Sequence, residues 1–177
     1  GRPHRRRGVG RTAAPGRSTE VLAAVERCRE QMKNLPEQDT GDEVTNPWNV
    51  REGMLDTGRE AAGNLGQWEI ALTLNSECVK YKTQRGADEL EVARTRFNDY
   101  GPLLNLQRFD DARTLLWYCR AIFEQEKAVY ELGAVYIALA GLEGKEGRPA
   151  SAVHFQHTAL RYTYQTVRPE DCAIGHH

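Results

Sequence analysis

The chain has 177 residues, of which 40% are hydrophobic and 28% charged, and its formal net charge is −1. These values are typical of one soluble domain or one short repeat array. No apolar run approaches the ~20 residues needed to span a bilayer, and no apolar segment of a secretory signal follows the N-terminal arginines. We therefore expect a cytoplasmic protein with no membrane partner.

Residues 1–17 form a basic tail that differs from the rest of the chain. The tail holds six arginines and no acidic residue, which leaves 18 basic and 25 acidic residues elsewhere. Its glycines and prolines and its lack of apolar residues predict disorder. One interpretation is an arm for nucleic acid or another acidic surface. The other, which we favour, is a solvated leader or the remnant of an upstream boundary, so nucleic acid is not the expected partner.

The helical part is expected to cover residues 18–177 and to begin with a helix at 18–34. Ser18 or Thr19 can cap the start of this first helix. A polar, acidic loop follows at 36–47 and ends in an Asn-Pro step that favours helix entry.

Three helix pairs are then predicted, at about residues 49–84, 89–126 and 129–166. The segments "LGQWEIAL" and "LQRFDDAR" repeat a turn, an aromatic residue and a small residue at the same offsets. The small residues Ala71, Ala112 and Ala152 are 41 and 40 positions apart, which is typical of a helical repeat array. Short turns at Gly66, at Gln107–Arg108 and at Gly147 join the two members of each pair, so the members must be antiparallel.

A second small residue follows each of these alanines after seven positions, at Cys78, Cys119 and Ala159. Seven residues make two helical turns, so each pair of small residues shares one helix face. We expect this face to contact a neighbouring helix closely. The cysteines, which include Cys28 and Cys172, are then buried thiols, since none has the close spacing of a metal or redox motif.

The chain is expected to end within a partial helix at 169–177, which begins at Pro169. A repeat array normally ends on a polar capping helix. We therefore expect the chain to belong to a longer protein, and the terminal helix is a possible surface for self-association.

The sequence resembles the tetratricopeptide repeat (TPR) family, in its long-repeat bacterial form. The second pair, "RFNDYGPLLNLQRFDDARTLLWYCRAIF", carries the family's aromatic residue, small residue, turn, aromatic residue and two small residues seven apart. The resemblance implies an all-α fold of antiparallel helix pairs stacked as a right-handed superhelix (an α-solenoid). It also implies that the first helices line a concave groove that binds a protein or peptide ligand.

Residues off the packing face of a first helix are candidates for this groove, and in the second pair these are Arg94, Asn98 and Asn105. An arginine can clamp a carboxylate at two points, and an asparagine amide can donate to and accept from a peptide backbone. Asn98 lies near a position where the family often has a peptide-contacting asparagine. The alternative is that these side chains are simply solvated.

Pro102 interrupts the helical pattern of the same segment. It has no amide to donate to the carbonyl of Asn98 four residues earlier, so we expect a kink. The kink either exposes that carbonyl in the groove or only bends the helix, and we favour the bend.

Other chemistry is not expected. His154 and His157 lie three apart, and Cys172, His176 and His177 follow, but no spacing supports four zinc ligands, so no metal is predicted. The sequence has no Gly-rich phosphate loop and no GxSxG or HExxH motif, so no cofactor and no enzymatic activity are expected.

The sequence therefore predicts a protein–protein or peptide interaction scaffold, the TPR module of a bacterial regulatory or signalling protein. The alternative is a peptide-sensing regulator that controls an attached effector or DNA-binding module.

Overall fold

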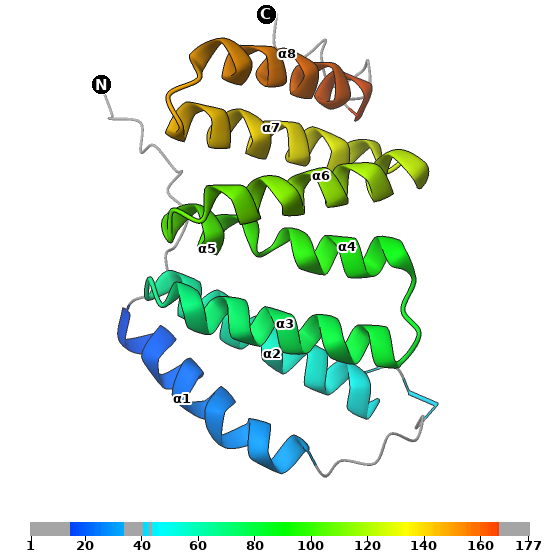
Figure 1. Cartoon of the computed structure of the whole chain (residues 1–177). Helices are drawn as coiled ribbons and strands as arrows, with labels where there is room; N and C mark the ends of the chain where they lie inside the picture. The colour runs from blue at the N-terminus through cyan, green and yellow to red at the C-terminus, as the bar shows by residue number, and fades with distance from the viewer. Residues whose placement is uncertain (1–14, 34–40, 43, 167–177) are drawn as a thin grey trace, which may run out of the picture.

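The computed structural model describes residues 15–33, 41–42 and 44–166, and Figure 1 shows its helices stacked in chain order from α1 to α8. The fold is all-α, and the described residues form no strand. The helices are α1 (Pro15–Met32), α2 (Pro47–Asn64), α3 (Trp68–Gln84), α4 (Glu89–Phe97), α5 (Tyr100–Asn105), α6 (Phe109–Gln125), α7 (Val129–Lys145) and α8 (Pro149–Thr166). None of them is both long and apolar enough to cross a lipid bilayer.

The helices lie in the segments where the apolar spacing predicts them, except for a shift at the first helix and a break in the first helix of the second pair. Helix α1 begins at Pro15, three residues before the predicted cap at Ser18. Proline is favoured in the first helical turn because its missing amide would have no partner there. Residues 15–17 therefore belong to a helix and not to the basic tail. Residues 1–14 and the partial helix predicted at 169–177 lie outside the described residues.

Five of the turns after α2, all except the α4–α5 connection, have the same backbone geometry. Each contains one residue with positive φ: Gly66, Gly86, Gln107, Lys127 and Gly147. In each turn the amide of the next residue donates to a carbonyl five positions back, as Gln67 does to Ala62 at 2.9 Å and Ala128 does to Phe123 at 2.9 Å. This is a Schellman cap, which satisfies the last carbonyls of the helix. Since the caps recur every 20 or 21 residues, the period near 40 consists of two helix-plus-turn units of similar length.

The small residues pack where the repeat predicts. Ala71, Ala112, Cys78 and Cys119 are at most 3% exposed. In the third pair Ala159 is also buried, but Ala152 is only half-buried. Helix α8 is the last helix that the structure describes, so its outer side has no further helix against it in the described residues.

The apolar core has two parts. One joins α1, α2 and α3 around Leu55 and Leu74, and the other joins α4 to α8 around Leu116 and Leu139. The boundary between the two clusters lies between α3 and α4, where polar and charged side chains form the hydrogen bonds and ion pairs described below.

The first helix of the second pair is broken, and not merely kinked at Pro102. The sequence predicts one helix from residue 89 to 106, but α4 ends at Phe97 and α5 starts at Tyr100. At the break, the amides of Asn98 and Asp99 donate to carbonyls only three residues back. Because Pro102 lies in the first turn of α5, where no amide is needed, the proline displaces the disruption by about one turn towards the N-terminus.

Candidate binding groove

An open groove with a volume of about 470 Å³ lies between the first helices of two successive pairs, α2 and α4. Its lining residues come from α2, α3, α4 and the α4–α5 break: Asn49, Glu52, Gly53, Asp56, Cys78, Lys82, Glu91, Arg94, Thr95 and Asn98. We call it the α2–α4 groove. It lies at the boundary between the two apolar clusters.

Arg94, one of the predicted groove residues, lines the α2–α4 groove but already has a partner. Its Nε donates to Oε1 of Glu131 on α7 at 2.7 Å, and its Nη2 lies 2.5 Å from the same oxygen. The Arg94 side chain is 53% exposed, while that of Glu131 is 19% exposed. The ion pair therefore connects the first helices of the second and third pairs at the surface, where a competing carboxylate can reach the arginine.

Asn98 lines the same groove from the α4–α5 break. Its side chain is half-buried, and within the described part of the chain its side-chain amide forms no hydrogen bond. A half-buried amide with free donors and acceptors can pair with a peptide backbone at little cost in desolvation. Of the predicted residues, Asn98 has the hydrogen-bonding capacity that such a site needs.

Asn105, the third predicted residue, does not line the α2–α4 groove. It is exposed near the end of α5, and its Nδ2 donates to the carbonyl of Gly101 at 2.8 Å. The helix break separates α5 from the register of α4, so the face that Asn105 would share with Arg94 in a continuous helix is not maintained.

Four charged side chains, Glu52, Lys82, Arg85 and Glu91, pair with one another at the base of the groove, and we call them its floor. Glu52 is 5% exposed and accepts hydrogen bonds from Nε of Arg85 at 2.6 Å, while Nζ of Lys82 lies 3.1 Å from it. Lys82 also donates to Glu91 at 2.5 Å, and Arg85 pairs with the same carboxylate. Two acids and two bases from α2, α3 and the start of α4 thus neutralise one another.

These pairs favour the charged forms of Lys82 and Glu91. Burial lowers the pKa of Lys82, but its hydrogen bonds to Glu91 and Glu52 outweigh this effect and raise the pKa above the usual value. Burial raises the pKa of Glu91, and the hydrogen bonds and charges of Lys82 and Arg85 lower it further than burial raises it. The floor is therefore a polar surface in which each of these charges has a partner of opposite sign.

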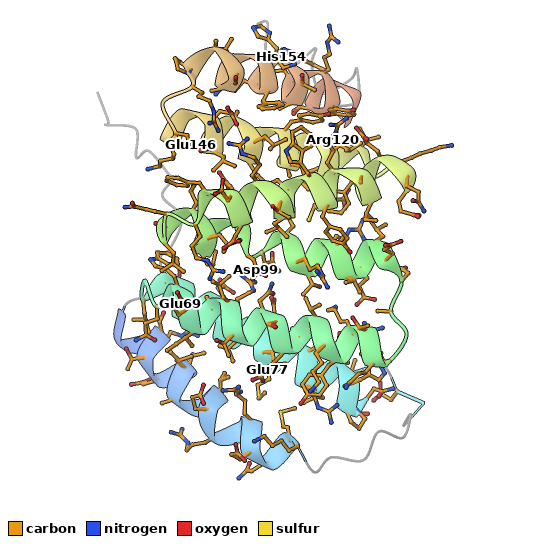
Figure 2. The ribbon with its side chains drawn as sticks, in the orientation of Figure 1. Glu69, Glu77, Asp99, Arg120, Glu146 and His154 are labelled. Carbon is orange, nitrogen blue, oxygen red and sulfur yellow. The ribbon has the colours of Figure 1, made fainter. Side chains whose placement is uncertain are left out.

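A buried asparagine holds the α4–α5 break against α3. Asn75 is 1% exposed, and its Nδ2 donates to the carbonyl of Thr95 and to Oδ1 of Asp99, each at 2.8 Å. Asp99 belongs to the α4–α5 break, on the side of the break that faces α3 (Figure 2). Burial raises the pKa of Asp99 to about 6, although Asn75 and the nearby positive charges act in the opposite direction.

Two of the three residues predicted from the sequence, Arg94 and Asn98, line the α2–α4 groove, whereas the residues of its floor were not predicted. Asn75 did give a signal, because it is the one polar residue in the apolar stripe of "WEIALTLNSECV". Basic residues at the end of α3 facing acids at the start of α4 are a further signal, since such residues complement the helix dipoles. Glu52 gave none, because its partners lie more than 25 positions away.

His154 and His157 are exposed on α8 and border a separate shallow depression with Tyr164. Within the described residues, no three His, Cys, Asp or Glu side chains are placed to hold a metal ion. Cys172, His176 and His177 lie outside the described residues.

The chain was compared with models of protein families, with curated proteins and with solved structures. No family model, no curated protein and no solved structure matches it.

Proposed function

We propose that this chain is a protein-interaction module that binds an extended peptide segment of a partner in the α2–α4 groove. The observation that carries the proposal is the groove itself, an open volume of about 470 Å³ that contains an exposed arginine and a half-buried asparagine with a free amide. Arg94 and Asn98 lie four residues apart, and both border this volume.

The proposal includes a stack of helix pairs arranged as a right-handed, TPR-like superhelix. The helical repeat near 40 residues, the uniform caps and the buried small residues at Ala71 and Ala112 support this arrangement. In such a stack the first helices α2, α4 and α7 share one face. The ion pair between Arg94 on α4 and Glu131 on α7 is consistent with that geometry.

Binding would proceed by exchange of partners at Arg94. A carboxylate from the peptide would replace Glu131 on the guanidinium, while the Asn98 amide would pair with the peptide backbone. The exposed Arg94–Glu131 pair is worth at most about 1 kcal/mol, so its loss costs little compared with a new two-point contact.

A peptide array probed with the purified full chain would identify ligands, and the strongest would then be measured by fluorescence anisotropy. We expect Arg94→Ala with Asn98→Ala to weaken binding by about tenfold or more, the equivalent of one charge-assisted hydrogen bond. Glu131→Gln should strengthen the binding of carboxylate-containing peptides, because it removes the internal competitor.

Two matched controls accompany these variants. Arg96→Ala removes an arginine of α4 that lies over the ring of Tyr118 and does not line the groove. Asn105→Ala removes the asparagine at the end of α5, which also does not line the groove. Neither should change the affinity by more than about twofold. The proposal would be refuted if the double variant bound as the wild type does, or if no peptide bound below about 1 mM.

A further inference from the structure

A second pocket, of about 260 Å³, lies at the end of the first helix pair. It is lined by Trp48 and Arg51 of α2 and by Tyr81, Gln84 and Arg85 at the end of α3, and we call it the Arg51 pocket. Its two guanidinium groups lie over its two aromatic rings, Arg85 at 4.3 Å from the centroid of Trp48 and Arg51 at 4.6 Å from that of Tyr81. An arginine stacked in this way is held in one plane, so its N–H groups point in fixed directions.

Arg51 is buried, and among the described residues it has no carboxylate partner. The residue is 7% exposed, its buried Nε has no hydrogen-bond partner, and its Nη2 reaches only the carbonyl of Met32, at 3.4 Å. In the described residues no acidic oxygen lies within 4.0 Å of its guanidinium group. An unpaired buried charge costs several kcal/mol, so a site that retains one needs a reason.

Two acidic residues of the described helices that pack around Arg51 are already paired with other cations. Glu52 accepts from Arg85, and Glu77, which lies on the side of α3 that faces α1 (Figure 2), accepts from Nε of Arg29 at 3.2 Å. The charge of Arg85 is thus balanced, whereas no described carboxylate balances that of Arg51. One uncompensated positive charge matches one carboxylate. A phosphate group would bring about two negative charges and leave an excess beside Glu52.

We propose that the Arg51 pocket binds a carboxylate group of a partner peptide, from an acidic side chain or from a free C-terminus. Arg51 supplies the charge and the N–H edge, the exposed Gln84 amide donates to a carboxylate oxygen, and Trp48 contacts the adjoining apolar atoms. This pocket is a second subsite. It contains neither Arg94 nor Asn98, so either site can fail its test without affecting the other.

The test is an NMR titration of the full chain that follows the arginine Nε–H resonances. The probes are three blocked tripeptides: acetyl-Ala-Glu-Ala-amide, acetyl-Ala-Ala-Ala with a free C-terminus, and the neutral acetyl-Ala-Gln-Ala-amide. We expect the first or second probe to shift the Arg51 resonance and the neutral probe to leave it in place. The stronger of the two charged probes identifies the source of the carboxylate.

Arg51→Met should lower the affinity for the charged probe by about tenfold or more, since it removes a charge-assisted hydrogen bond. The matched control is Arg59→Met on the same helix, whose guanidinium pairs with Asp56 at 2.6 Å and does not line the pocket. The control should change the affinity by less than about twofold.

Three outcomes would overturn the assignment. The neutral probe could bind as tightly as the charged ones, Arg51→Met could bind as the wild type does, or inorganic phosphate could bind more tightly than either carboxylate. If circular dichroism shows that Arg51→Met does not fold, the wild-type titration decides: an Arg51 resonance that stays in place while the probe binds elsewhere refutes the proposal.

Discussion

The packing of α1 against α2 can be tested by one added methyl group at Gly58. A Cβ atom at Gly58 would lie 2.7 Å from Cγ1 of Val25 and 3.1 Å from Cδ1 of Leu74. Carbon atoms in contact are normally ~3.5–4.0 Å apart, so Val25 must retreat by about 1 Å. Both neighbours are at most 5% exposed, and a β-branched valine has few other rotamers. Overpacking of this kind costs about 1–3 kcal/mol.

Gly53 on the same helix supplies the matched control, because nothing lies within 4 Å of a Cβ added there. Each Gly→Ala change gains about 1 kcal/mol of helix propensity, and this gain cancels when the two variants are compared. We therefore expect Gly53→Ala to be more stable than the wild type and Gly58→Ala to be less stable than Gly53→Ala by about 1–3 kcal/mol. In thermal melts the difference corresponds to about 2–12 °C.

The assay is urea and thermal denaturation followed by far-UV circular dichroism. Combining Gly58→Ala with Val25→Ala removes the methyl groups that clash, so the two changes together should cost less than the sum of their separate effects. If Gly58→Ala stabilises the chain as much as Gly53→Ala does, the close approach of α1 to α2 is wrong.

Two further predictions concern titratable groups. Because burial raises the pKa of Asp99 to about 6, folding favours the protonated carboxyl, and the stability that this proton provides at low pH is lost as the pH rises from about 4 to 6. Asp99→Asn keeps an oxygen acceptor for Asn75, so in urea titrations its gain in stability over the wild type should be larger at pH 7 than at pH 4. An equal gain at both pH values would show that this carboxyl keeps its ordinary pKa. Burial also raises the pKa of the Cys78 thiol to about 11 and that of the Cys119 thiol to about 12. Mass spectrometry after brief iodoacetamide treatment at pH 8 should therefore find Cys28 modified well before either of them. Equal modification rates for Cys28 and Cys119 would contradict the burial of this face of α6.

Local sequence patterns determined most of the secondary structure. The spacing of Phe109, Ala112 and Leu116 predicts the buried face of α6, and all three contribute to the core. Gly66 and Gly147 mark two of the turns because glycine adopts positive φ without strain. The turn at Lys127 has the same geometry without a glycine. At this turn the packing of α6 against α7, and not the type of turn residue, decides the backbone conformation.

The tertiary structure alone decided what the candidate sites contain. Asn75 reaches Asp99 across 24 positions and Arg94 reaches Glu131 across 37, and no local pattern encodes such a meeting. In the sequence, Arg51 is one more charged helical residue, and only the packing of α1, α2 and α3 buries it where no described carboxylate reaches it. Helix periodicity follows from neighbours along the chain, whereas the pairing of charges depends on which helices lie side by side.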